Sequence, residues 1–332
     1  MNFFSVLFLS LSLTACDNKP EDIHVPDVET AQYENPVINK SAPDPSILYV
    51  EGKGYYLYTT EDIRNMPVFH STDLVIWRQA GTVFTNATRP TWETGGSLWA
   101  PDINCINGKY VLYYSMAIWD AMATSGVGVA VADKPEGPFT DRGPVLRSHT
   151  IGVVNSIDPC YIEDGGKKYL FWGSYHGIYG IELSDDGLSI RQGAEKKQVA
   201  DVYEGTYIHK RGQYYYLFGS VGTCCEGLKS TYTTVVGRSE SLWGPYTDKQ
   251  GRSMMQNHHE IVITGNSYFV GTGHNSEIVQ DGAGNDWILY HAYNVDNNRG
   301  RNVMLDKIQW VNDWPTIVGN SPSSMANSPK FE

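Results

Sequence analysis

Basic residues are scarce in this chain: 25 Lys and Arg stand against 37 Asp and Glu, which leaves a net charge of −12. A protein whose main partner is DNA, RNA or an anionic membrane surface needs a basic face, so this composition excludes nucleic acid as the main partner. Charged residues of both signs make up only 19% of the 332 residues, whereas 41% are hydrophobic. That hydrophobic fraction suffices for a large core and excludes an intrinsically disordered chain.

Long hydrophobic runs are also absent. Residues 1–15 are uncharged and mostly apolar, but spanning a bilayer takes about 20 apolar residues. The run ends in Leu13-Thr14-Ala15-Cys16, which resembles a bacterial lipobox and predicts a lipoprotein signal peptide over 1–15 with a lipid on Cys16. An ordinary signal peptide cut near Cys16 is the alternative. Residues 16–34 are expected to form an acidic flexible tether, and the protein to be exported and lipid-anchored in the bacterial envelope, at the periplasm or the cell surface.

Cysteine is rare as well, with 5 in the chain and no C-x-x-C pair, which argues against a zinc site. Four remain after Cys16: Cys105, Cys160, Cys224 and Cys225. An exported protein can form disulfides. Cys224 and Cys225 are adjacent, however, and a bridge between neighbours is strained, so small buried thiols are expected.

Aromatic residues and glycines are abundant, with 9 Trp, 22 Tyr, 10 Phe and 33 Gly. Five segments share a polar start, a short β-rich run, a turn with Gly or Asn and an aromatic β-rich run; they are 44–60, 101–116, 158–174, 204–220 and 274–293. Each is typical of a β-hairpin, and further strands fill the intervals. The repeat predicts an all-β, five-bladed β-propeller over residues 35–320, followed by a tail over 321–332. Two stacked β-sandwiches are the alternative.

A polar residue opens each repeat: Asp44, Asp102, Asp158, Glu204 and His274. The first strand of each propeller blade lines the central channel, so these residues are expected to ring one end of it. A ring of like charges is costly to a fold and therefore indicates chemistry. Taken singly, each has a structural alternative, because Asp-Pro starts turns and a carboxylate such as Asp102 can hold a loop.

The order DPS (44–46), LWAPDI (98–103), NSIDP (155–159), Glu204-Gly205 and GHNS (273–276) resembles glycoside hydrolase family 43. More narrowly, residues 204–218 and 224–251 are similar to the endo-acting α-1,5-L-arabinanases. The resemblance covers about residues 36 to 315, and the family fold is a five-bladed β-propeller, as the repeat predicts independently.

The resemblance implies a role for each carboxylate. Asp44 matches the general base that activates water, and Glu204 matches the general acid that protonates the leaving oxygen. Asp158 matches a third carboxylate that tunes and orients the acid. The family inverts the anomeric centre, for which base and acid lie roughly 6.5–9.5 Å apart.

His274 matches a histidine that binds a central cation, usually Ca²⁺, largely through water, and His291 is a weaker second candidate. Calcium prefers oxygen ligands, so a structural, hydrogen-bonding histidine is the alternative.

Sugar rings bury well against aromatic faces. Trp99 and Tyr175 are therefore expected to bind substrate, together with Asp102, whereas core packing is favoured for Trp92, Trp119 and Trp172. Departures from the family pattern at Thr206, where proline is frequent, and at Tyr175-His176, where Phe-Trp is frequent, leave the sugar-binding subsites open.

These observations predict an exported enzyme that cleaves plant arabinan or arabino-oligosaccharides. An exo-acting α-L-arabinofuranosidase or β-xylosidase is the alternative within the family, and loops 86–98, 117–125 and 294–302 decide between them. A non-catalytic surface glycan-binding propeller is the alternative from another class.

Overall fold

Strands are the main regular structure of residues 31–331, the part of the chain that the computed structural model describes, and tight turns join many of them. The turns carry the residues that their backbone demands. Asn107 and Gly108, for example, both have positive φ between two paired strands, as a two-residue hairpin turn requires. The predicted signal peptide, the lipid on Cys16 and the tether up to residue 30 lie outside the described residues.

Three separate sheets each contain four antiparallel strands in chain order. Their strands are β2 (Ser46–Val50), β3 (Gly54–Tyr58), β4 (Pro67–Ser71) and β5 (Arg78–Thr82); β6 (Ser97–Ile106), β7 (Lys109–Ala117), β8 (Gly126–Ala132) and β9 (Thr140–Arg147); β10 (Cys160–Asp164), β11 (Lys167–Trp172), β12 (Ile178–Glu182) and β13 (Lys197–Ala200).

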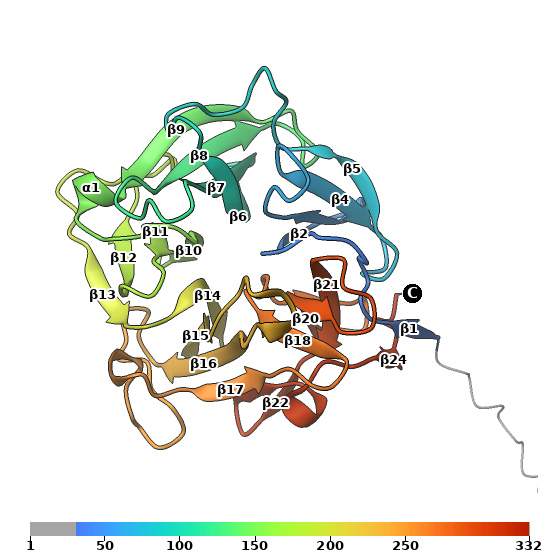
Figure 1. Cartoon of the computed structure of the whole chain (residues 1–332). Helices are drawn as coiled ribbons and strands as arrows, with labels where there is room; N and C mark the ends of the chain where they lie inside the picture. The colour runs from blue at the N-terminus through green and yellow to red at the C-terminus, as the bar shows by residue number, and fades with distance from the viewer. Residues whose placement is uncertain (1–30, 332) are drawn as a thin grey trace, which may run out of the picture. The chain divides into compact units, whose positions relative to one another are not determined.

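An eight-stranded sheet follows, in which β16 and β18 join two groups of strands through one parallel pair, Thr233 with Thr272. The first group is β14 (Glu204–Arg211), β15 (Tyr214–Val221), β16 (Thr233–Ser239) and β17 (Glu260–Ile263); the second is β18 (Phe269–Gly273), β19 (Val279–Gln280), β20 (Asp286–Asn294) and β21 (Arg301–Lys307). The sheets stand around a common centre, with β2, β6, β10 and β14 nearest to it (Figure 1).

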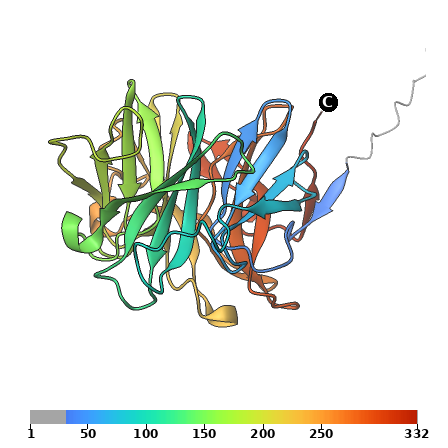
Figure 2. The ribbon, with the colours of Figure 1, turned by 90° about the horizontal axis from the view of Figure 1, so that it is seen from above.

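Short elements complete the described part: β1 (Gln32–Glu34) paired with β24 (Met325–Asn327), β22 (Gln309–Val311) paired with β23 (Trp314–Thr316), and the helices α1 (Ser148–Ile151), η1 (Gly227–Lys229), η2 (Met254–Gln256) and η3 (Val318–Asn320). Seen from the side, the strands run between two faces, and the gold loop with η1 projects from one of them (Figure 2). Within residues 31–331, no helix is long and apolar enough to cross a membrane.

The core consists of apolar clusters between neighbouring groups of strands. Each cluster joins side chains of two successive groups, and the last joins the fifth group to the first; examples are Tyr58 with Leu112, Val129 with Leu170, Phe171 with Leu217, Phe218 with Tyr290, and Leu289 with Leu57. Both faces of each group are therefore buried. This arrangement confirms the predicted all-β fold and explains the nearly continuous apolar runs in the strands.

The two ends of the fold differ from the sequence prediction. Residues 32–34, expected in the tether, form β1, and residues 325–327, expected in the tail, form β24, which pairs with it. Tyr33 is buried, and its hydroxyl donates to the Leu305 carbonyl at 2.6 Å. The boundaries at 34 and 321 were therefore wrong. The Tyr33 hydrogen bond attaches β1 to β21, and the pairing with β1 holds β24 in place.

Candidate active site

A cleft of about 810 Å³ collects most of the predicted site residues. Asp44, Asp158, Glu204 and His274 all line it, although they come from sequence positions more than 200 residues apart. The sequence prediction that the repeat starts converge is therefore correct for these four side chains.

The backbone explains the convergence. Asp44, Asp158 and His274 have φ of 56°, 60° and 48°, and Gly205, directly after Glu204, has φ of 61°. Non-glycine residues seldom adopt this left-handed conformation, and such outliers concentrate at functional sites. A Cβ added at Gly205 would approach His274 to 3.1 Å, so this position suits glycine for lack of room as well.

The N–H group of each of these residues is held by a side chain. Asp158 donates to Ser115 Oγ and His274 to Ser220 Oγ, both at 2.9 Å. Gly205 instead donates to Asp158 Oδ2 at 2.9 Å. This hydrogen bond ties Asp158 to the segment that carries Glu204.

Asp44 is buried among groups that favour its charged form. Arg301 Nη1 and His274 Nδ1 lie 3.2 and 3.4 Å from its Oδ1, and the Thr60 hydroxyl donates to Oδ2 at 2.6 Å. Burial alone would raise the pKa of Asp44, but Arg301 and then His274 reverse the effect and hold it well below its usual value. Asp44 is therefore ionised near neutral pH, as a general base must be.

Asp158 has the opposite environment. Burial, together with the charges of Glu204 and Asp44, raises the pKa of Asp158 to about 7, against the opposing effects of His274 and the Gly205 N–H. A substantial fraction of Asp158 is therefore protonated at neutral pH. Glu204 itself is held by two hydroxyl groups: Ser174 Oγ lies 2.7 Å from its Oε2, and Tyr175 Oη lies 2.9 Å from its Oε1.

Asp102 does not line the cleft, so the structure does not bring it together with the other predicted site residues. Ala100, with φ of 43°, occupies the place that Asp44 has in the first repeat, so that Asp102 lies two residues further along the strand. Asp102 Oδ2 accepts hydrogen bonds from the Tyr161 N–H at 2.9 Å and from Asn104 Nδ2 at 2.7 Å. Burial and the neighbouring Glu277 raise its pKa well above the usual range, which marks a buried carboxyl pair.

The histidines were predicted as metal ligands. His274 lines the cleft, whereas His291 is fully buried, stacks on Tyr232 with ring centroids 5.6 Å apart, and does not line it. Burial lowers the pKa of His291 to about 4, so it is neutral at physiological pH. Among residues 31–331 no group of three or more His, Cys, Asp or Glu side chains could hold a metal ion. These residues therefore do not build a calcium cage, and His274 could supply only one ligand of an ion coordinated mainly by water.

Aromatic side chains line part of the cleft. Trp99 and Tyr175 line it as predicted, and so does Trp119, which was expected in the core but is 65% exposed. The Trp99 and Trp119 rings meet edge to face, with centroids 6.1 Å apart. Trp172 is fully buried, and Trp92 packs against a core tyrosine, as expected for both. The exposed aromatic surface is of the kind that binds sugar rings.

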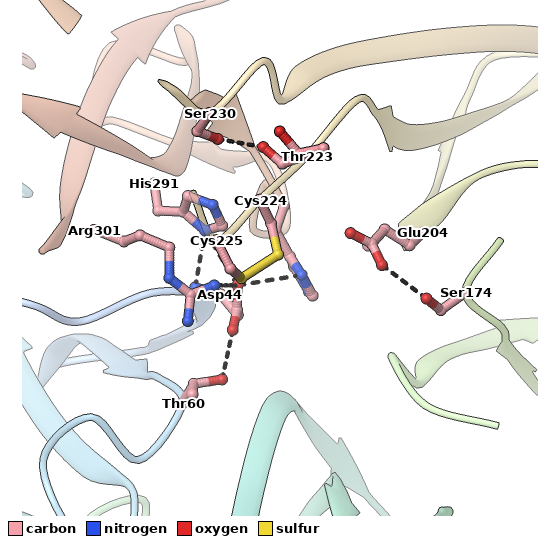
Figure 3. Close-up of a disulfide and its surroundings, with 12 residues drawn as sticks. Asp44, Thr60, Ser174, Glu204, Thr223, Cys224, Cys225, Ser230, His291 and Arg301 are labelled. Atoms are coloured by element: carbon pink, nitrogen blue, oxygen red, sulfur yellow. Dashed lines mark hydrogen bonds and ion pairs between the residues drawn. A yellow bond between two sulfur atoms is a disulfide. The ribbon is translucent and has the colours of Figure 1, made fainter. Parts of the chain in front are cut away.

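The loop after β15 forms another part of the wall, and sequence reasoning missed it. Cys224 and Cys225 are joined in a disulfide and line the same cleft as Asp44 (Figure 3), so the predicted pair of free thiols is wrong. Both side chains turn toward the cleft, and the Tyr293 hydroxyl holds the Cys224 carbonyl at 3.3 Å. Of the other thiols, Cys160 is buried as expected, whereas Cys105 is exposed. The two adjacent cysteines are the only feature of the sequence that could have indicated this bridge.

An ionised carboxylate, Asp44, shares the cleft with the neighbouring carboxyls Asp158 and Glu204 and with Trp99 and Trp119. This arrangement is typical of a glycoside hydrolase. Residues 33–315 match the model of the glycosyl hydrolases family 43, and the chain belongs to this family.

Relatives of known activity support the assignment. An extracellular exo-α-(1→5)-L-arabinofuranosidase of Cellvibrio japonicus is 32% identical over 95% of this chain and 92% of its own length. An extracellular endo-α-(1→5)-L-arabinanase of Bacillus subtilis is 31% identical over 84% of this chain and 88% of its own. Among solved structures, the α-L-arabinanase of Cellvibrio cellulosa complexed with arabinohexaose has a TM-score of 0.76 at 33% identity, covering 83% of this chain and 95% of that one.

Proposed function

We propose that this enzyme hydrolyses α-1,5-linked L-arabinan by endo-cleavage with inversion at the anomeric carbon. The observation that carries the proposal is the contrast between two carboxyls in one cleft: Asp44 is held ionised by Arg301 and His274, while burial and the neighbouring charge of Glu204 raise the pKa of Asp158. The names of the relatives supply the sugar and the linkage.

In the proposed mechanism, Glu204 transfers its proton to the glycosidic oxygen as the bond from C1 to that oxygen breaks. Asp44 takes a proton from a water molecule that attacks C1 from the opposite face. Asp158 receives the Gly205 N–H and keeps the adjacent Glu204 in place. Arg301 and Thr60 orient Asp44 and preserve its charge.

The first test is incubation of the purified chain with linear arabinan, with product sizes followed over time. A ladder of oligosaccharides whose new reducing ends are first in the inverted configuration by NMR is the expected result. Glu204→Gln should abolish it, whereas Glu226→Gln, which changes an exposed carboxyl of the same cleft, should not. Binding without any product would favour a glycan-binding protein instead.

Exo-action is the second candidate, because the Cellvibrio japonicus relative carries that name. Arabinose or short products of fixed length from the first time point, with no ladder, would select it. The loop with Trp119 and the loop with the Cys224–Cys225 disulfide both border the cleft, and their shape governs how far a polysaccharide extends beyond the cleavage point.

We also propose that the fold is a five-bladed β-propeller. The apolar clusters between successive groups of strands, with the last group packed on the first, support this count. So does the recurring side-chain acceptor at the strand ends, which is Thr60, Ser115, Ser220 or His291.

Two further parts of the proposal concern calcium and location. A Ca²⁺ ion at His274 would take one imidazole nitrogen and water as ligands, and would add positive charge beside Asp44 and Asp158. Calcium that wild type retains after dialysis and His274→Ala loses would support this site.

Export is supported by the relatives named extracellular. Metabolic labelling with a radioactive fatty acid, lost in Cys16→Ala, tests the lipid anchor.

A further inference from the structure

We infer that Tyr175 is a positioning residue for the general acid: its hydroxyl links the Glu204 carboxyl to the Gly222 carbonyl in the loop that carries the cleft disulfide. The inference rests on the proposed function and deepens it. It assigns Tyr175 a role through Glu204 in place of a simple contact with the sugar.

The distances favour one arrangement of the protons. Tyr175 Oη is 2.5 Å from the Gly222 carbonyl oxygen and 2.9 Å from Glu204 Oε1. A carbonyl oxygen can only accept, and a phenol carries one proton. The Tyr175 proton therefore belongs to the shorter contact with Gly222. The longer contact is then a hydrogen bond only if Glu204 is protonated and donates from Oε1 to Oη.

The other oxygen of Glu204 agrees with this assignment. Ser174 Oγ lies 2.7 Å from Oε2 in a buried position, which suits a hydroxyl donating to the unprotonated oxygen of a carboxylic acid. Ser174 and Tyr175 are consecutive, and Tyr175 has φ of 53°, a left-handed conformation that directs both side chains at Glu204. Figure 3 shows the Ser174 contact on the side of Glu204 that faces away from Asp44.

The same hydroxyl can serve the reaction after proton transfer. When Glu204 delivers its proton to the leaving oxygen, a negative charge develops on the carboxylate. Tyr175 can then turn its own proton from the Gly222 carbonyl to Oε1 and stabilise that charge. No covalent bond of Tyr175 changes: the transferred proton goes from Glu204 to the leaving group, and the phenol proton only changes its acceptor.

A phenylalanine at this position, which the family resemblance implies is frequent, could do neither. The link is thus a property of this chain's own residue at position 175. It also couples the acid to residues 222–226, the segment that places Cys224 and Cys225 in the cleft wall.

The experiment compares two substrates that differ in their need for an acid. In an unmodified arabino-oligosaccharide the leaving group is a sugar hydroxyl, which must be protonated to depart. In an arabino-oligosaccharide with a 2,4-dinitrophenyl group at its reducing end, the leaving group is dinitrophenolate, which departs without protonation. For Tyr175→Phe we expect kcat/KM on the unmodified oligosaccharide to fall about 10- to 100-fold and kcat/KM on the aryl substrate to fall less than about threefold. Tyr179→Phe is the matched control, since it also removes a partly buried hydroxyl, from the strand that follows Tyr175, outside the cleft.

Equal losses on both substrates, or a change confined to KM, would overturn the inference and leave Tyr175 as a sugar contact. Hydrogen exchange provides a readout without substrate: residues 222–232 should exchange roughly fivefold faster in Tyr175→Phe, because the Gly222 carbonyl loses its donor. Unchanged exchange there would overturn the link to Gly222. Wild type inactive on both substrates would refute the proposed function, and with it the acid role, while the exchange result would still decide whether the link exists.

Discussion

Thr60 is a single hydroxyl on which both the catalytic base and the contact between two sheets depend. Its Oγ1 donates to Asp44 Oδ2 at 2.6 Å and accepts the Ala100 N–H at 2.7 Å, in a position only 3% exposed. Thr60→Val keeps the shape and removes both bonds. A bond to a charged group contributes about 1.5–3 kcal/mol, and a buried N–H left without an acceptor costs about 1–3 kcal/mol. We therefore expect the free energy of unfolding to fall by roughly 3–5 kcal/mol and kcat to fall with it, because Asp44 loses a donor that orients it.

Urea denaturation followed by tryptophan fluorescence measures the change in stability, and hydrolysis of arabino-oligosaccharides measures kcat. Thr59→Val is the control, since the neighbouring hydroxyl is equally buried but makes only a 3.4 Å contact with the Thr60 carbonyl. Thr60→Ser restores the hydroxyl and should recover most of both losses. If Thr60→Val and Thr59→Val are equally stable and equally active, the reasoning about Thr60 is refuted.

Three further outcomes are expected. Arg301→Met should raise the pKa of Asp44, since Arg301 is the main group that offsets the effect of burial on this pKa. The acidic limb of the pH–activity profile should then move to higher pH, and an unmoved limb would contradict the reasoning. Replacing Cys224 and Cys225 together by serine should lower stability by only roughly 1 kcal/mol, because the bridge closes a very short loop, while KM for oligosaccharides rises; calorimetry and kinetics measure the two effects. Asp102→Asn should retain near wild-type kcat/KM, because Asp102 lies outside the cleft and its raised pKa favours the uncharged form; a large loss would restore its predicted role in binding.

The repeat in the sequence was sufficient to predict the sheets and the convergence of Asp44, Asp158 and Glu204. It failed at Asp102 because pattern matching aligned the polar residues, whereas the structure aligns the left-handed backbone positions. Ala100 holds that position in the second repeat, and an alanine gives no signal of it.

The walls of the cleft could not be predicted in the same way. A tryptophan in a loop, such as Trp119, is apolar and favours burial, and only the path of the loop decides whether it faces solvent. The bridge between Cys224 and Cys225 likewise depends on the turn that holds them. The general expectation that neighbouring cysteines do not form a disulfide therefore failed for Cys224 and Cys225.

The contacts around Asp44 have a consequence for how this enzyme would lose activity. Asp44 stands where the first sheet meets the last: its N–H approaches His291 on β20, and its carboxylate approaches Arg301 on β21. The segment that leads into β2 is attached to β21 by hydrogen bonds, between Ile38 and Val303 and from the Ala42 N–H to the Arg301 carbonyl, so noncovalent contacts keep the junction closed. A local opening there would separate the base from its partners while the remaining sheets stay folded. Heating would then inactivate the enzyme at a temperature below the one at which its β-structure melts.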